Sequence, residues 1–202
     1  MIKKFIRKIL GVKDERDPTQ PVKLGAEEHG IDLKLLSPNA IRLTQTLQEA
    51  GFQAFVVGGA VRDLLLGVKP KDFDIATDAT PEQVKKLFRR AFIIGRRFQI
   101  VHVMFGQELL EVTTFRGKGS DNAPKDEHGR VLRDNSFGPQ HEDAERRDFT
   151  INAMYYDPAT QTVLDYHGGI ADIREKTLRI IGVPEARYRE DPVRMLRVVR
   201  FA

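Results

Sequence analysis

Two aspartates stand two residues apart in the stretch KDFDIATDATPEQV, residues 71–84. Phe73 and Ile75 alternate with Asp72 and Asp74, a pattern that predicts a strand over residues 72–76. Side chains at i and i+2 of a strand share one face, with Cα atoms about 7 Å apart, so the two carboxylates would repel each other. A shared cation removes this repulsion, and Mg²⁺ binds through one or two carboxylates plus substrate phosphates. Asp72 and Asp74 are therefore candidate metal ligands, with a solvated strand end as the alternative.

A third carboxylate, Glu111, lies in the segment ELLEVTTFR, residues 108–116. This segment predicts another strand, on which Leu109, Glu111 and Thr113 share one face. A third acid is expected where two metal ions share one site about 3.5–4 Å apart. The alternative for Glu111 is an acid at the rim of the sheet.

The segment VVGGAVRDLLLG, residues 56–67, combines a predicted strand, a Gly58-Gly59 turn and a predicted helix. Glycine lets a ligand approach the backbone closely, and a helix N-terminus offers free N–H groups to phosphate. Arg62 could reach the same phosphate oxygens. The segment matches neither a Walker loop nor the Gly-x-Gly-x-x-Gly dinucleotide pattern. A plain tight turn is the alternative.

The last segment, RYREDPVRMLRVVRF at residues 187–201, has charged residues at helical spacing. Asp191 precedes Arg194 by three residues, and Arg197 and Arg200 follow at the same interval, so a helix would align them in one stripe. Aspartate accepts and arginine donates hydrogen bonds, so Asp191 with Arg194 could read the edge of a nucleobase. The alternative is an exposed row of ion pairs.

The sequence lacks the residues that several other kinds of active site require. The chain has no cysteine, so it has no disulfide, thiolate metal site or cysteine nucleophile. Its five histidines show no metal-ligand spacing, and no Gly-x-Ser-x-Gly serine elbow is present. No apolar run is long enough for a membrane span, and the charged N-terminus is no signal peptide, so a cytoplasmic location is expected.

The net charge of +4 is concentrated at the N-terminus. Residues 1–10 carry four basic and no acidic side chains, which equals the charge of the whole chain and leaves the remainder neutral. Their apolar residues follow helical spacing and predict a short basic amphipathic helix, suited to an anionic membrane surface or an RNA backbone. A frayed tail, or a helix docked on the body of the protein, is the alternative.

Between these motifs the pattern predicts alternating helices and strands. A helix should start at the Ser37-Pro38 cap signal and run to about Ala50, and residues 52–57, 91–95 and 98–106 should form strands. Residues 11–36 look like a linker, and residues 117–140 form a long polar loop of the kind that is usually functional or disordered.

In this order the motifs resemble the class II nucleotidyltransferase superfamily, which comprises bacterial poly(A) polymerases and CCA-adding enzymes, and are most similar to its poly(A) polymerase branch. The resemblance covers residue 29 to the end. It rests on the strings GGAVRDLLLG…KDFDIATDATPEQV, EVTTFR, RRDFTINAMYY, DYHGGIADI and EDPVRMLRVVRF.

The resemblance implies an α+β fold: a nucleotidyltransferase (polymerase β-like) head, with a mixed sheet flanked by helices, followed by the start of an all-helical neck. Residues 1–36 would form a basic tail and linker, residues 37–176 the catalytic head and residues 177–202 the first part of the neck. Helical periodicity continues to the end of the sequence, so we expect a longer protein with an RNA-binding body and tail beyond it.

The resemblance also implies the reaction: template-independent transfer of AMP from ATP to an RNA 3′ end, with release of pyrophosphate and with Mg²⁺ or Mn²⁺ as cofactor. Asp72 and Asp74 would bind the metals, with Glu111 completing the acidic site. Asp148 would lie at the ribose or the incoming hydroxyl, and Asp191 and Arg194 would face the adenine. The triphosphate or sugar would be held by Gly58, Gly59, Arg62, Arg147 and Arg197.

Two alternatives stay open. A CCA-adding enzyme would use the same chemistry and make a different product. A non-catalytic module would tether RNA or a membrane through residues 1–10, which is also how a peripheral membrane association could arise. ATP and an RNA 3′ end are the expected partners, and a monomer is the expected state.

Overall fold

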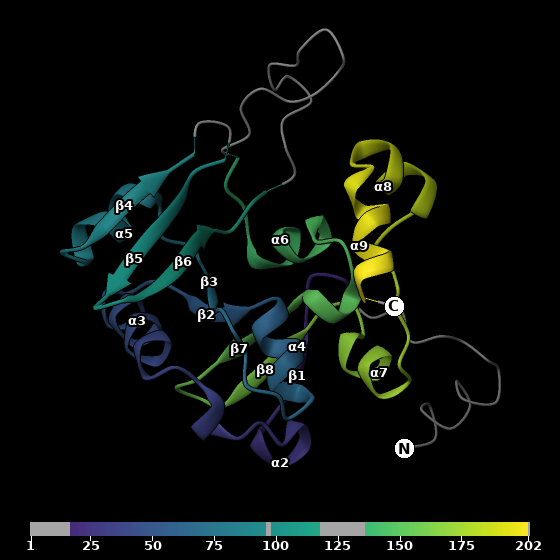
Figure 1. Cartoon of the computed structure of the whole chain (residues 1–202), viewed down its shortest axis with the longest axis horizontal. Helices are drawn as coiled ribbons and strands as arrows, with labels where there is room; N and C mark the ends of the chain where they lie inside the picture. Colours follow the sequence, from purple (N-terminus) through teal and green to yellow (C-terminus); the bar gives the residue numbers. More distant parts are fainter. Residues whose placement is uncertain (1–16, 96–97, 118–135, 202) are drawn as a thin grey trace, which may run out of the picture.

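A computed structural model describes residues 17–95, 98–117 and 136–201 of the chain. Within them the strands form one mixed sheet in the order β1-β8-β7-β2-β3-β6-β5-β4 (Figure 1). Only β3 and β6 pair in parallel; the other described pairs are antiparallel. The strands are β1 (Val22–Leu24), β2 (Ala54–Val57), β3 (Asp74–Thr77), β4 (Ala91–Ile94), β5 (Ile100–Phe105), β6 (Glu108–Thr114), β7 (Met154–Asp157) and β8 (Thr162–Asp165).

The described residues also form eight α-helices, some of which pack on the two faces of this sheet. They are α2 (Ala26–His29), α3 (Pro38–Glu49), α4 (Gly59–Leu65), α5 (Pro81–Leu87), α6 (Gln140–Arg146), α7 (Gly169–Arg174), α8 (Pro184–Glu190) and α9 (Val193–Phe201), with short 3₁₀ turns η1 (Leu33–Leu35) and η2 (Thr150–Asn152). In the view of Figure 1, α6 lies between the strands β4 to β6 and the helices α8 and α9.

Alternate residues of β2, β3, β7 and β8 enter two separate cores. Ala54 and Val56 of β2 join the larger core, to which α3, α4 and α5 contribute their apolar faces. Phe55 and Val57 join the smaller core on the opposite face, where Ala144 of α6 packs. The period of two along a strand produces this division, and it sets which face every neighbouring side chain occupies.

The predicted helix at residues 37–50 is present as α3, and its cap is the one that the sequence indicates. The hydroxyl of Ser37 accepts hydrogen bonds from the backbone N–H groups of Asn39 and Ala40 at 3.2 and 3.3 Å, and Pro38 occupies the first turn. Its buried residues Leu43 and Leu47 share one face at i and i+4 and anchor the helix to the larger core.

The N-terminal linker prediction is wrong for residues 22–29. Val22 to Leu24 form β1, which pairs with β8, and α2 follows directly. Nε2 of His29 also lies 2.9 Å from the carbonyl oxygen of Gln161. A three-residue edge strand with mostly exposed side chains carries too short an alternation to be recognised, because backbone pairing rather than burial holds it. Residues 1–10, with their predicted helix, and most of the long polar loop lie outside the described residues.

The predicted strand at residues 72–76 begins two residues later, at Asp74. Asp74 pairs with Val57, the last residue of β2, and the chain of β2 then turns into the Gly58-Gly59 segment. Asp72 and Phe73 therefore have no residue of β2 to pair with. Asp72 lies in the segment that leads into the strand, and its side chain is exposed.

The C-terminal segment forms two helices, α8 and α9, at the place where helical periodicity predicts them. Leu196 and Val199 of α9 are 72% and 77% exposed. The division into tail, head and neck at residues 37 and 177 stays a prediction. Within the described part of the chain, no helix combines the length and the apolar character that crossing a membrane would need.

Helix α7 approaches η2 so closely that Gly169 is required between them. A Cβ at Gly169 would overlap the carbonyl oxygen of Thr150. We expect Gly169→Ala to lower the free energy of unfolding by about 3 kcal/mol, because the backbone must move to relieve this overlap. Urea unfolding of the two proteins measures the difference.

Gly25→Ala is the matched control. Gly25 has a φ of −82°, and its Cβ would meet only the flexible Glu28 side chain at 3.9 Å. This variant should change the stability by less than about 0.5 kcal/mol. Equal effects at the two glycines would contradict the close approach of α7 to η2.

Candidate active site

The parallel pairing of β3 and β6 brings two acids together. Asp74 and Glu111 are Cα partners in this pair, so their side chains leave the same face of the sheet as direct neighbours. This is the face of the smaller core and of α6, because Asp74 and Ala76 are two residues apart and Ala76 belongs to that core. Both acids stay accessible: Asp74 is exposed, and the Glu111 side chain is 44% exposed.

The charge of Asp74 is unfavourable where it stands. Removal of water by the surrounding protein, followed by repulsion from Glu111, raises the pKa of Asp74 above its ordinary value. The nearby guanidinium of Arg147 opposes the rise, and Asp72 adds a smaller repulsion. Asp72 and Glu111 thus both act electrostatically on Asp74, although only Asp74 and Glu111 are paired in the sheet.

This crowding bears on the metal ion that the sequence predicts. In the described residues, no cluster of three or more His, Cys, Asp or Glu side chains has the spacing of a ready-made metal site. Mg²⁺ needs no such cage, since it commonly binds one or two carboxylates together with substrate phosphates and water. Loss of water and then repulsion from Glu111 disfavour the charge of Asp74, and a cation would offset both, so the acids present fit an ion that arrives with a nucleotide.

The Gly58-Gly59 turn lies directly beside these acids, because Gly58 follows Val57, the partner of Asp74. Gly58 has a φ of +74°, which favours glycine, and a Cβ there would lie 3.6 Å from Nη1 of Arg147. Arg62 stands over Gly59: its guanidinium would lie 3.6 Å from a Cβ at that position. The turn therefore has two arginine side chains against its backbone.

Arg62 is held in place by two neighbours. Its Nε and Nη2 donate to one carboxylate oxygen of Asp63, and its Nη1 donates to Oδ1 of Asn152 at 2.9 Å. Its guanidinium also lies 5.2 Å from the ring centroid of Phe201 in α9.

Arg147 is fixed by a buried polar pair that the sequence analysis missed. Its Nη2 donates to Oδ2 of Asp143 at 3.0 Å, and its Nε donates to the hydroxyl of Tyr155 at 3.3 Å. The Tyr155 hydroxyl donates in turn to the same Asp143 oxygen at 2.6 Å. Burial opposes ionisation of Asp143, but Arg147, Tyr155 and the backbone of Arg116 outweigh it and hold the pKa of Asp143 below its ordinary value.

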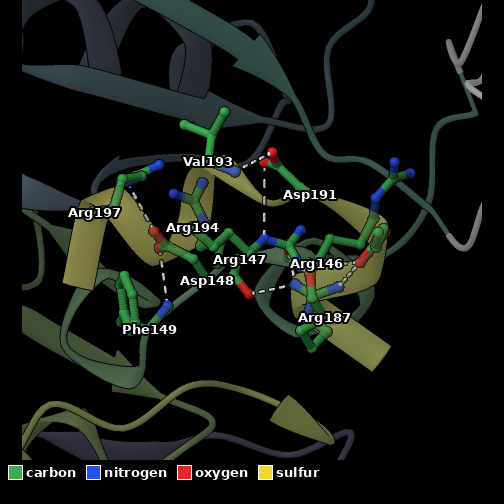
Figure 2. A network of polar contacts seen from close by, with 10 residues as sticks. Arg146, Arg147, Asp148, Phe149, Arg187, Asp191, Val193, Arg194 and Arg197 are labelled. Atoms are coloured by element: carbon green, nitrogen blue, oxygen red, sulfur yellow. Dashed lines mark hydrogen bonds and ion pairs between the residues drawn. The ribbon is translucent and has the colours of Figure 1, made fainter. Parts of the chain in front are cut away.

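Asp148 follows Arg147 and is buried. Its Oδ1 accepts from the backbone N–H of Phe149 at 2.9 Å, and its Oδ2 lies 3.0 Å from Nε of Arg197 (Figure 2). The structure thus brings Asp148 and Arg197 together, although 49 positions separate them along the chain. The Arg197 side chain is half exposed, so one face of this ion pair is open to solvent.

Asp191 and Arg194 lie where α8 passes into α9. Oδ1 of Asp191 accepts from the backbone N–H of Val193, and its Oδ2 lies 4.0 Å from Nε of Arg194. Nη1 of Arg194 donates to the carboxylate of Glu190 at 2.9 Å and to the carbonyl oxygen of Arg187 at 3.2 Å (Figure 2). The Asp191 side chain is 49% exposed and that of Arg194 11%, so Asp191 offers an accessible acceptor beside a fixed arginine.

Three residues around the site were not singled out from the sequence. Asp143 stands four residues before Arg147, and this i, i+4 spacing in a helical segment could have indicated the ion pair. The partnership with Tyr155 has no such signal, because it depends on the position of β7. His102 lies opposite Glu111 on β5, with Nε2 3.4 Å from Oε1, a contact that only the strand register shows.

Comparison with known protein families shows which family has a sequence like that of this chain. Residues 54–179, more than half of the chain, match the family described as the poly A polymerase head domain. The chain belongs to this poly(A) polymerase head-domain family. The match includes both acids of the β3–β6 pair, the glycine turn and the Arg147-Asp148 segment, and it ends before α8.

Curated relatives fall on both branches of the superfamily. Poly(A) polymerase I of Salmonella typhi is 52% identical over 98% of this chain, and poly(A) polymerase I of Haemophilus influenzae is 50% identical over 87% of it. The CCA-adding enzyme of Bacillus subtilis is 46% identical over 80% of the chain. The aligned parts make up 45%, 40% and 40% of these relatives, so the chain spans less than half of their length.

Solved structures confirm the predicted nucleotidyltransferase head. The CCA-adding enzyme of Bacillus stearothermophilus, in complex with CTP, gives a TM-score of 0.69 at 38% identity, over 82% of this chain and 39% of its own. The CCA-adding enzyme of Thermotoga maritima, complexed with tRNA, gives a TM-score of 0.66 over 89% of this chain and 41% of its own. At 24% identity the second comparison supports the fold alone.

The crowding at Asp74 predicts a gain in stability when its charge is removed. We expect Asp74→Asn to raise the Tm at pH 7 in EDTA. Because the folded state binds the Asp74 proton more tightly than the unfolded state, ionisation lowers wild-type stability as the pH rises above 3.8, the ordinary pKa. The gain should therefore shrink as the pH falls toward that value, which thermal unfolding at several pH values measures.

Glu82→Gln is the control for this experiment. Glu82 lies exposed in the first turn of α5, so the substitution removes a carboxylate outside the site. It should give no gain in Tm. A Tm of Asp74→Asn equal to or below that of the wild type in EDTA would contradict the electrostatic crowding.

Proposed function

We propose that this chain is the catalytic head of a template-independent RNA 3′-end adenylyltransferase, a poly(A) polymerase that transfers AMP from ATP and releases pyrophosphate. The observation that carries the proposal is the register of β3 and β6, which sets Asp74 opposite Glu111 beside the Gly58 turn. The likeness to two poly(A) polymerases I at 52% and 50% identity supports the choice of reaction. The relatives are more than twice as long, so the proposal concerns the complete protein.

Each group of residues has a role in the proposed reaction. The reaction takes place beside the carboxylates of Asp72, Asp74 and Glu111. There the RNA 3′ oxygen bonds to the α-phosphorus of ATP as the bond from that phosphorus to the β-phosphate breaks. Arg62 and Arg147, with the backbone of Gly58 and Gly59, hold the triphosphate. Such a transfer asks the protein mainly for positioning and charge stabilisation, and fixed arginines supply both.

Mg²⁺ or Mn²⁺, bound to Asp72 and Asp74 together with the phosphates, would neutralise charge and activate the 3′ hydroxyl. The chain supplies the carboxylates at one accessible place on the sheet and keeps Arg147 close enough to Asp74 to act on its pKa. No side chain has to become a covalent nucleophile in this scheme, which agrees with a sequence that has no cysteine.

Sugar and base are assigned to the α9 side of the site. Asp148 and Arg197 would hold the ribose or the neighbouring phosphates, in an ion pair that is half open to solvent. Asp191 would accept from the amino group of adenine while Arg194 donates to a ring nitrogen. Support comes from the exposure of Asp191 and from the contact of Arg194 with Glu190, which limits its movement.

A CCA-adding enzyme is the second candidate. It is favoured by the solved structure with CTP at 38% identity and by the Bacillus subtilis relative at 46% identity. Both activities would use the same acids and arginines, so the nucleotide that is added distinguishes them. A monomeric state, a cytoplasmic location and membrane contact through residues 1–10 stay predictions.

The product ladder decides between the two candidates. The complete protein is incubated with a short RNA, Mg²⁺ and one nucleoside triphosphate at a time, and the products are separated on a denaturing gel. We expect a long ladder with ATP alone. Addition of CTP that stops after a few nucleotides would support the CCA-adding enzyme, and no addition of any nucleotide would refute both.

Removal of either paired acid tests the reacting centre. We expect Asp74→Asn and Glu111→Gln each to lower kcat for ATP addition by about a thousandfold or more, because they remove charges that stabilise the transition state by several kcal/mol. Both variants should keep the wild-type circular dichroism spectrum. Glu82→Gln should retain full activity, and full activity in Asp74→Asn would refute the role of this site.

A further inference from the structure

Arg187 of α8 directs its guanidinium at the protein backbone. Its Nη2 donates to the carbonyl oxygens of Arg146 and Arg147, both at 2.7 Å, and its Nη1 pairs with Glu190 at 2.7 Å (Figure 2). The side chain is only 14% exposed. An arginine in contact with two successive carbonyl groups of another element fixes that element at a defined distance.

The two carbonyl groups belong to the end of α6, which stops at Arg146. The last carbonyl groups of a helix have no partner within the helix, and a cation at this end is favourable. Arg187 therefore acts as a C-terminal cap that is supplied by a different helix. Arg147 and Asp148 directly follow α6 in the chain. By holding the end of α6, Arg187 therefore also fixes the position of these two residues.

Apart from these contacts, the surroundings of the Arg187 guanidinium disfavour its positive charge. Burial, and then repulsion from Arg194, lower the pKa of Arg187 below its ordinary value. Its Nε is buried and has no hydrogen-bond partner among the described residues. Gly182, with a φ of +87°, leaves room for the stem: a Cβ there would lie 3.4 Å from Cδ of Arg187. The contacts with the carbonyl groups and with Glu190 are what compensate for this burial.

The other side of the Arg147-Asp148 segment is attached separately. The N–H of Ile181 donates to the carbonyl oxygen of Asp148 at 2.8 Å, and the N–H of Thr150 donates to that of Arg179 at 3.0 Å. These bonds hold the segment to the strand-like residues before α8. The ion pair of Asp148 with Arg197 ties the segment to α9, and Arg187 adds an attachment from α8. Arg194 continues the series by donating to the carbonyl oxygen of Arg187.

We infer that Arg187 is a positioning residue that sets the distance between the two ends of the nucleotide site. It joins Arg147 and Asp148, which would hold phosphates and sugar, to Asp191 and Arg194, which would read the base. The inference rests on the proposed function. It predicts that Arg187 is needed for tight binding of a ligand that contacts both ends of the site. A ligand that occupies only one end should bind equally well without it.

Ligand binding to the complete protein tests this prediction. Isothermal titration calorimetry in Mg²⁺ measures the Kd of ATP, which spans both ends, and of inorganic tripolyphosphate, which reaches only the phosphate end. We expect Arg187→Met to weaken ATP binding about tenfold and to leave tripolyphosphate binding within about twofold of the wild type. A role limited to stability would change both affinities alike or neither, since Arg147 keeps its own partners Asp143 and Tyr155.

Two further variants complete the experiment. Arg187→Lys keeps a cation that can donate to the same carbonyl groups and should restore ATP affinity to within about threefold of the wild type. Arg174→Gln is the matched control: the exposed Arg174 donates to the carbonyl oxygen of Glu28, near the end of α2, at 3.3 Å, and its loss should change neither affinity. Thermal unfolding establishes that each variant is folded, and Arg187→Gln replaces Arg187→Met if the latter is not.

Three results would overturn the inference: unchanged ATP binding in the folded Arg187→Met variant, an equal loss for ATP and tripolyphosphate, or no recovery in Arg187→Lys. A wild-type protein that binds neither ligand would instead refute the proposed function. The two failures are therefore distinguishable.

Discussion

Repulsion between neighbouring carboxylates is the constraint on which the rest of this structure depends. The parallel pairing of β3 and β6 sets Asp74 beside Glu111, and water cannot fully screen their charges because the surrounding protein removes part of it. A sheet built for stability alone would place apolar or oppositely charged residues there. The fold supports this placement through its larger core, where α3, α4 and α5 bury the opposite face of the same strands.

Positive charge balances the acids at fixed positions. The guanidinium of Arg147 lowers the raised pKa of Asp74, and it can do so because Asp143 and Tyr155 hold it in place. A flexible lysine would offer the same charge without the planar geometry that satisfies both partners at once. Charges that are fixed before the ligand arrives need no reorganisation when it binds, and for this reason rigid arginines suit the transfer of a phosphoryl-type group.

The sequence was most informative where a short period repeats. Alternation marked the strands that carry Asp74 and Glu111, and the Ser37-Pro38 signal marked the start of α3. It was wrong about residues 22–24, because three mostly exposed residues make too short a pattern. It also extended the strand back to Asp72, since alternation continues past the point where β2 ends and pairing stops.

Relations across the sheet and between distant segments could not be predicted from local pattern. Which residue of β6 faces Asp74 depends on register, and a shift by one residue would turn Glu111 to the opposite face. The contacts of Arg187 are with carbonyl oxygens, which every residue has, so no choice of side chain at Arg146 or Arg147 signals them. The partnership of Asp148 with Arg197 needs α9 to return to the end of α6.

The edge strand β1 also affects how the protein is made. Its partner β8 lies about 140 residues later in the chain, so the ribosome completes nearly the whole sheet before β1 can pair. At synthesis rates of about 5–20 residues per second, this delay lasts roughly 7–28 s. During that time the segment around Val22 lacks its partner strand, although it precedes the other described strands in the chain.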